Sequence, residues 1–236
     1  MCHKTSIIIL SYNTLELLQL CIASIREFTE AGTYEIIVVE NASKDGSAEW
    51  LREQMDLRCI YNEENRGFPG GCNQGLTAAT GTELLLLNSD TVVTKDWLKN
   101  LRLALYSNAR VGAVSCVTNY CSNSQQIEVP YERLEDMQAF AARHNVPNPA
   151  LWRKRTTLVG FCYLFKREVF DKVGFLDERF SPGNFEDDDY SLRILQAGYD
   201  LLICQDTFIH HFGHGSFLKG GTEQEMLEKL KRAEAL

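Results

Sequence analysis

Short apolar runs alternate with amphipathic stretches through the first 93 residues of the chain. The apolar runs are rich in Ile, Val and Leu, which is typical of strands buried on both faces of a sheet. Between them, apolar residues recur at helical spacing, for example at Leu18, Cys21 and Ile25. The predicted strands are 6–10, 34–39, 58–61 and 84–87, and the predicted helices are 15–28, 48–54 and 72–79.

This alternation predicts an α/β fold with a mostly parallel central sheet flanked by helices and joined by right-handed crossovers. Polar segments follow three of the strands, at 11–14, 40–47 and 88–90. Because ligands of open α/β sheets bind at the carboxyl ends of the strands, these segments predict a nucleotide-binding edge. The glycine-rich loop 65–71 lacks the Gly-Lys-Ser/Thr of a P-loop, and no GxGxxG sequence is present. Ser47 is expected to cap the second helix.

The second half of the chain is predicted to continue with shorter and less regular elements. Residues 119–155 are polar, and either contact an acceptor or partner or form a solvated surface excursion. The whole chain, 1–236, is expected to be one domain, with a nucleotide-binding half (1–93), an acceptor and catalytic half (94–217) and a C-terminal helix (218–236). The predicted elements are helices 96–107, 134–144, 168–173 and 186–197 and strands 111–117, 158–166, 201–204 and 207–211.

Composition narrows the functional classes. The chain is 44% hydrophobic, enough for a sizeable core, and its net charge of −8 argues against nonspecific binding to nucleic acid or anionic membranes. A nucleotide substrate remains compatible, because a metal ion and helix N-termini can offset phosphate charge locally. The eight cysteines include no CxxC pair, which favours reduced, buried thiols over a zinc site or a disulfide framework. No integral membrane segment is predicted, and a cytoplasmic location is expected.

Two acidic groups and one histidine group carry the candidate chemistry. Asn88-Ser89-Asp90 ends a leucine-rich strand, where a carboxylate can hold a divalent cation and, through it, the phosphates of a nucleotide; a plain strand-end turn is the alternative. The cluster Glu186–Asp189 fits either acid–base chemistry or helix capping with a solvated face. His210, His211 and His214 follow. Together these groups indicate chemistry on a phosphate-linked substrate.

Seven segments, in order and nearly spanning the chain, resemble the family-2 glycosyltransferases, the inverting nucleotide-sugar enzymes of the GT-A fold. They are SIIILSYN, IIVVENASKDGS, NEENRGFPGGCNQG, LLLLNSDTVV, VGFCYLFKREVFDKVGFLDERF, FEDDDYSLRILQAGY and IHHFGHGSF. The resemblance implies a Rossmann-like GT-A fold. It also implies transfer of a sugar from a UDP- or dTDP-sugar to a hydroxyl of a glycan or protein acceptor, by single displacement with a divalent cation, Mn²⁺ or Mg²⁺. A neutral imidazole among the ligands suits manganese better.

The resemblance assigns donor and metal residues. Glu40 takes the place of the usual aspartate that reads the base or ribose. Asn88-Ser89-Asp90 corresponds to the Asp-x-Asp motif, so Asp90 is the direct metal ligand, and Asn88 removes one charge and is expected to weaken metal binding. His211 completes the metal or diphosphate site, whereas His210 and His214 match less well. The remaining donor residues are Ser11, Tyr12 and Asn13 at the pyrimidine edge and Asn65, Arg66 and Gly67 in a second wall.

The resemblance also assigns acceptor-side residues. Asp187 corresponds to the catalytic base, and Glu186 precedes it. A helix N-terminus would lower the pKa of Asp187 and neighbouring carboxylates would raise it, so the sum stays open. Gly160 and Phe161 match the segment beneath the donor sugar and acceptor. Trp152 is assigned either to glycan stacking or to the core or a partner contact.

Two other functions remain in view. A nucleotidyltransferase of the same fold is disfavoured because its first strand usually ends in a glycine-rich signature, and here that corner reads SYNT. A degenerate module that binds a nucleotide sugar without turnover is supported only by Asn88. The sequence leaves the donor sugar, the acceptor and membership of a larger enzyme or complex open.

Overall fold

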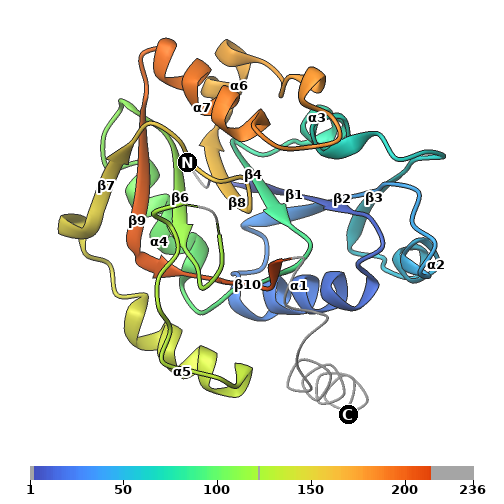
Figure 1. Cartoon of the computed structure of the whole chain (residues 1–236), viewed down its shortest axis with the longest axis horizontal. Helices are drawn as coiled ribbons and strands as arrows, with labels where there is room; N and C mark the ends of the chain where they lie inside the picture. Colours follow the sequence, from blue (N-terminus) through green and yellow to red (C-terminus); the bar gives the residue numbers. More distant parts are fainter. Residues whose placement is uncertain (1–2, 122, 214–236) are drawn as a thin grey trace.

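The computed structural model describes residues 3–121 and 123–213 of the chain. Within these residues a central eight-stranded sheet carries helices on both faces, and a two-stranded ribbon lies beside it (Figure 1). The strands are β1 (Thr5–Ser11), β2 (Tyr34–Glu40), β3 (Leu57–Tyr61), β4 (Glu83–Asn88), β5 (Thr91–Val92), β6 (Val111–Val117), β7 (Trp152–Arg155), β8 (Cys162–Lys166), β9 (Asp200–Phe208) and β10 (His210–His211). The helices are α1 (Leu15–Phe28), α2 (Ser47–Arg52), α3 (Gly67–Ala78), α4 (Trp97–Leu105), α5 (Leu134–His144), α6 (Arg167–Val173) and α7 (Glu186–Gln196).

The sheet has the strand order β3-β2-β1-β4-β8-β6-β9-β7. The first four strands are parallel, β6 and β9 are parallel to each other, and β8 and β7 run antiparallel to their neighbours. The prediction of a mostly parallel sheet is therefore confirmed, with the mixed pairing confined to the second half. The connections from β1 lead to β2 on one side, whereas β4 lies on the other. Such a switch point is where α/β sheets bind ligands.

Alternate residues of the central strands feed two separate cores. Ile7 and Ile9 of β1 pack on one face with α1 and α4, where Trp97 is fully buried. Ile8 faces the opposite way and packs with α3 and α7, where Tyr190 is fully buried. Because side chains alternate across a strand, a sheet covered on both faces needs apolar residues at every position. This explains the uninterrupted apolar runs in the sequence.

Helix α3 begins earlier than predicted. The segment 67–71, expected to be loop, already forms its first turns. A Cβ on Gly71 would overlap the side chain of Leu10, and one on Gly75 would overlap that of Ile8. The glycines therefore bring α3 unusually close to β1 rather than marking a loop.

The predicted Ser47 cap is wrong. Ser47 is the first residue of α2, and its backbone N–H and hydroxyl both donate to Asp45 Oδ1, at 3.0 and 2.6 Å. The same aspartate accepts a hydrogen bond from the Leu15 N–H through Oδ2 at 2.8 Å. Asp45 thus serves the N-terminal turns of two helices at once, which spacing along the sequence does not reveal.

The strands of the second half also differ from the prediction. Strand β8 starts at Cys162 rather than at 158, because the N–H groups of Leu158 and Gly160 donate to side chains of α7 instead of a neighbouring strand. Strand β9 is continuous through the predicted break at 205–206, where its ladder with β6 is irregular. Strand β7, of sequence WRKR, was not predicted because an exposed edge strand lacks apolar alternation.

Two sequence expectations concern the ends of the chain and its relation to membranes. The expected helix over 218–236 lies outside the described residues. Across the described part of the chain, no helix combines the length and apolar character that crossing a bilayer requires. The seven cysteines of that part are all free thiols.

Candidate active site at the carboxyl edge of the sheet

The three polar segments that follow β1, β2 and β4 meet at one edge of the sheet. The Asn13 N–H donates to Ser43 Oγ at 3.0 Å, and Asn13 Oδ1 accepts from the Lys44 N–H at 2.8 Å. Thr14 donates through its hydroxyl to Ser89 Oγ at 3.0 Å. The predicted convergence of these segments is therefore present, and short polar contacts tie them into one surface.

The predicted donor wall is organised by Asn41, which the sequence reasoning missed. Asn41 is buried at the end of β2 and donates through Nδ2 to Asn65 Oδ1 at 2.7 Å. Its Oδ1 accepts from the Arg66 N–H at 3.0 Å. The neighbouring Glu40 is also buried, and its Oε1 accepts from the Ser43 N–H at 2.6 Å. The position of Asn41, directly after a buried strand, is the signal that would have identified it.

Gly67 contacts another part of the protein rather than open space. Its φ of 72° is in the left-handed region, and a Cβ would overlap Ser181 Oγ. The Phe68 N–H donates to Pro182 O at 2.7 Å. Gly67 thereby docks the 181–185 loop, which leads into α7, against the start of α3. Tyr12, assigned to the pyrimidine edge, is 46% exposed.

Asp90 and His211 face each other beside the end of β4. His211 Nε2 lies 3.2 Å from Asp90 Oδ1 and 3.4 Å from Asn88 Nδ2. Pairing of β10 with β5, His211 opposite Thr91, brings these residues together from distant parts of the chain. Burial alone would lower the pKa of His211, but the hydrogen bond and charge of Asp90 outweigh it and leave that pKa raised.

The metal-binding side chains at this site suit a cation whose remaining ligands come from its substrate. Within residues 3–121 and 123–213, no three His, Cys, Asp or Glu side chains are grouped to hold a metal. Asp90 and His211 would supply two ligands to such a cation, with the Asn88 amide beside them. Mg²⁺ in nucleotide sites is commonly held by one or two carboxylates plus substrate phosphates and water. The residues therefore fit a metal that binds together with a diphosphate.

The other two histidines do not join this pair. His210 Nδ1 lies 2.8 Å from the Tyr131 hydroxyl, and burial lowers the pKa of His210 to about 3. His210 is therefore a neutral, buried contact to the 119–155 segment. His214 lies outside the described residues.

Replacing Asn88 with aspartate is expected to tighten Mn²⁺ binding in the presence of nucleotide by about 10-fold, because a second carboxylate adds charge to the ligand set. Titration of Mn²⁺ followed by electron paramagnetic resonance would measure the change. Asn108→Asp, on an exposed loop, is the matched control and should leave the affinity unchanged. Equal affinity in Asn88→Asp and the native protein would contradict the proximity of Asn88 to the ion.

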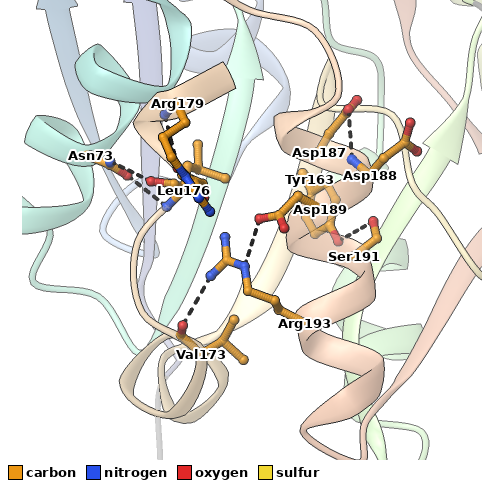
Figure 2. Close-up of polar contacts among 11 residues, drawn as sticks. Asn73, Tyr163, Val173, Leu176, Arg179, Asp187, Asp188, Asp189, Ser191 and Arg193 are labelled. Atoms are coloured by element: carbon orange, nitrogen blue, oxygen red, sulfur yellow. Dashed lines mark hydrogen bonds and ion pairs between the residues drawn. The ribbon is translucent and has the colours of Figure 1, made fainter. Parts of the chain in front are cut away.

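Asp187 lies at the start of α7 with its carboxylate anchored on both oxygens. Oδ2 accepts from the Gly160 N–H and Oδ1 from the Asp188 N–H, each at 2.9 Å. Burial raises the pKa of Asp187 despite these hydrogen bonds. Desolvation, which the sequence reasoning did not weigh, is thus the largest influence on this carboxyl. Asp189 pairs with Arg193, whose Nε lies 2.7 Å from Asp189 Oδ2, and Asp189 turns away from Asp187 (Figure 2).

Glu186 is buried next to Asp187, and its Oε2 accepts from the Asn184 N–H at 2.6 Å. Burial raises the pKa of Glu186 as well. The preceding residue, Phe185, is 67% exposed. Glu186 therefore shapes the turn into α7, and the exposed aromatic beside it was not recognised from the sequence.

The segment Gly160–Phe161 connects the two acidic sites. The Gly160 N–H donates to Asp187 Oδ2, while Phe161 O accepts from the Asn88 N–H at 2.9 Å. The Phe161 ring stacks on His211 with centroids 5.3 Å apart and planes 15° apart. A single short segment thus spans from the carboxylate of α7 to the Asp90–His211 pair.

Trp152 is not brought to this site. It lies on β7, the outermost strand of the sheet, and its indole N–H donates to Asp206 Oδ2 at 2.9 Å. The ring packs against the core on the α1 and α4 side of the sheet. Of the two assignments left open by the sequence, the structure supports the core contact.

Known proteins similar to this chain identify its family. Residues 6–174 match the family described as glycosyl transferase family 2, well over half of the chain. The chain belongs to this family. Glycosyltransferase AglE of Haloferax volcanii is 24% identical to this chain, over 87% of this chain and 66% of its own length. The family-2 assignment made from the seven sequence segments is therefore confirmed.

Solved structures confirm the GT-A fold. The mannosyltransferase PcManGT from Pyrobaculum calidifontis, in complex with GDP-Man and Mn²⁺, has a TM-score of 0.68 at 23% identity and aligns with 92% of this chain and 60% of its own. GalNAc-T7, solved with UDP, GalNAc and Mn²⁺, has a TM-score of 0.70 at 16% identity, covering 89% and 44%. Several curated relatives that match most of this chain are longer than it. This chain spans between 17% and 66% of their lengths.

Proposed function

We propose that this chain transfers a sugar, with inversion, from a nucleoside diphosphate sugar to a hydroxyl of a glycan or protein acceptor. The observation that carries the proposal is the Gly160–Phe161 segment, which holds Asp187 at one end and contacts Asn88 and His211 at the other. A base and a diphosphate site joined in this way suit a single in-line displacement, in which one group deprotonates the acceptor while another receives the leaving group.

The donor side of the proposal uses the edge formed by β1, β2 and β4. Ser11, Tyr12 and Asn13 would contact the base, and Glu40 and Asn65 would contact the base or ribose. The donor is proposed to carry uridine or thymidine, as the resemblance of the first corner implies. The neighbouring structures were solved with a guanosine as well as a uridine nucleotide, so both bases belong in any test. Arg66 and Gly67 begin the second wall of this site.

The metal side of the proposal rests on Asp90 and His211, with Asn88 and Ser89 beside them. Mn²⁺ or Mg²⁺, when bound, would supply Lewis-acid stabilisation of the charge on the leaving diphosphate. Asp90 and His211 would hold the ion, and the stacked ring of Phe161 would restrict rotation of the His211 imidazole. Mn²⁺ in both neighbouring structures supports this choice of cation.

Asp187 is proposed to act as the general base. A half-buried carboxylate with a raised pKa accepts a proton more readily than a fully exposed one, while the Gly160 N–H keeps its orientation fixed. Oδ2 would lie toward the acceptor hydroxyl beside Gly160. Glu186 would maintain the turn that presents Asp187, through its hydrogen bond to the Asn184 N–H.

The pH dependence follows from the raised pKa of Asp187. The base must be ionised, so kcat/KM should fall as pH drops through that pKa, and the acid limb should lie above pH ~4, the ordinary value for aspartate. Transfer rates across pH, for the native protein and for Glu186→Gln, would measure it. An acid limb of kcat/KM at or below the ordinary pKa of aspartate would contradict the assignment of Asp187 as the base. An acid limb that disappears in Glu186→Gln would contradict it as well.

The function itself is tested by thermal stabilisation with a panel of UDP-, dTDP- and GDP-sugars, with and without Mn²⁺. A ligand that binds only the native state raises the apparent melting temperature. We expect a Mn²⁺-dependent rise with one class of donor. If no donor raises the apparent melting temperature, the proposal is contradicted.

A second candidate, a module that binds nucleotide sugars without turnover, is supported by the single substitution at Asn88. Slow hydrolysis of a bound donor, dependent on Mn²⁺, separates the two functions, since only a competent transferase activates the anomeric carbon.

A cytoplasmic location is part of our proposal and is supported by the free cysteines of the described chain. Assembly into a larger enzyme is supported by the greater lengths of the relatives.

A further inference from the structure

Strand β10 carries the two adjacent histidines and is held by the segment that follows β6. On one side it pairs with β5. On the other, the His211 N–H donates to Asn119 Oδ1 at 2.9 Å, and Asn119 Nδ2 donates to His211 O at 3.1 Å. One amide side chain thus satisfies both backbone groups of the same residue, as a neighbouring strand would.

The residue after Asn119 orients the imidazole itself. His211 Nδ1 lies 2.8 Å from the backbone oxygen of Tyr120. A carbonyl oxygen can only accept, so Nδ1 carries the hydrogen of that bond. The other ring nitrogen, Nε2, is consequently the one turned toward Asp90 Oδ1. The ring of Tyr120 covers the backbone beyond this histidine, where a Cβ on Gly213 would overlap it.

We propose that Asn119 and the Tyr120 carbonyl are positioning residues that set the metal affinity of His211, an inference that rests on the proposed function. Metal-binding histidines commonly donate their second ring nitrogen to a carbonyl or carboxylate, which fixes the ring and its tautomer. Here the same short segment holds both the backbone and the ring of His211. Loss of this support would leave the imidazole free to turn away from Asp90.

The local structure does not depend on Asn119 alone. Thr118 accepts through its backbone oxygen from the Ile127 N–H at 2.8 Å and donates through its own N–H to Gln125 O at 2.9 Å. These bonds anchor the segment directly before Asn119. A variant at Asn119 is therefore expected to keep the path of the chain and to change mainly the support of His211.

The neighbouring histidine offers a matched control. Tyr131, from the same part of the chain, contacts His210 through its hydroxyl at 2.8 Å. Tyr131→Phe removes one half-buried hydrogen bond to β10 and leaves the contacts of His211, the residue that faces Asp90, in place. If general loosening of β10 governed metal binding, this variant would weaken it as much as a variant at Asn119.

The test compares Asn119→Ala, Asn119→Asp and Tyr131→Phe by Mn²⁺ titration in the presence of UDP, followed by electron paramagnetic resonance. We expect about 10- to 100-fold weaker Mn²⁺ binding for both Asn119 variants, as for the loss of other outer-shell partners, and an unchanged affinity for Tyr131→Phe. Asn119→Asp keeps the acceptor for the His211 N–H, so it retains the fold if Asn119→Ala does not. Nitrogen chemical shifts of His211 should show protonated Nδ1 in the native protein and mixed tautomers in the Asn119 variants.

Two outcomes would overturn the inference separately from the proposed function. Native Mn²⁺ affinity in a folded Asn119 variant would make Asn119 a structural residue only, while the transferase proposal would stand. Equal weakening by Tyr131→Phe would assign the effect to β10 as a whole. Failure of the native protein to bind Mn²⁺ with any nucleotide would instead contradict the proposed metal site, and the inference with it.

Discussion

Asp187→Asn is expected to lower the rate of sugar transfer by about 10²- to 10⁴-fold, the usual contribution of a general base. Donor binding should be unchanged, because Asp187 contacts Gly160 and Asp188 rather than the Asp90–His211 pair. The amide oxygen of asparagine can still accept from the Gly160 N–H, so that anchor is retained. The proton acceptor and the hydrogen bond from the exposed Asp188 N–H are lost. Initial rates at saturating donor, together with the donor dissociation constant, would measure the effect.

The same variant should not lose stability. The folded-state pKa of Asp187 is raised by burial, so the folded protein binds a proton there more tightly than the unfolded chain. At pH above both pKa values the ionised carboxylate therefore opposes folding, and that cost disappears as pH falls below them. Asparagine carries no charge and avoids this cost at neutral pH. The free energy of unfolding, measured in urea, should be equal to or greater than that of the native protein.

Asp188→Asn is the matched control for this prediction. Asp188 is the next residue of α7, and its side chain is exposed. The contact with Asp187 uses the Asp188 backbone N–H, which the substitution leaves in place. Native transfer rates are expected. Loss of donor binding in Asp187→Asn, or equal losses of transfer in both variants, would refute the assignment of the base.

Asp90→Ala is expected to abolish the dependence of nucleotide affinity on Mn²⁺. Loss of an outer-shell partner already costs about 10- to 100-fold in metal affinity, so loss of a carboxylate ligand should cost at least as much. The remaining His211 is neutral when it binds a metal, and the Asn88 amide carries no charge, so no anionic ligand would remain in this donor set. Calorimetric titration of UDP with and without Mn²⁺ would measure the difference.

Asp96→Ala provides the comparison for Asp90. Asp96 is an aspartate near the start of α4 that pairs with Lys99 at 3.7 Å and is partly exposed. Its removal should leave the effect of Mn²⁺ on UDP affinity as in the native protein. An Asp90→Ala protein that still binds UDP more tightly with Mn²⁺ than without it would show that the ion is held elsewhere.

Much of the fold, and the edge of the sheet at which the candidate site lies, was predictable from the sequence. Buried strands need apolar residues on both faces, and Ile7 to Ile9 and Leu84 to Leu87 meet that need without interruption. Because successive strands alternate with helices, the carboxyl ends of β1, β2 and β4 had to lie at one edge. The family's motifs are contiguous along the chain, so their order was visible before any contact was known.

The residues that were missed share a different property. Asn41 and Asn119 act through hydrogen bonds to residues far away in sequence, namely Asn65 and His211, at separations that no periodicity encodes. The sequence left two assignments for Trp152, because an aromatic residue occurs both in protein cores and on binding surfaces. Its bond to Asp206 depends on the pairing of β7 with β9.

The sequence by itself determined the α/β alternation, the family and the edge at which the site lies, because these depend on local apolar periodicity and contiguous motifs. The tertiary structure alone decided the environment of each site residue. The pKa of Asp187 is raised because folding partly removes it from water, which outweighs the hydrogen bonds that it accepts. His211 faces Asp90 because β10 pairs with β5. Burial and pairing between distant segments exist only once the chain has folded, so no local pattern could have shown them.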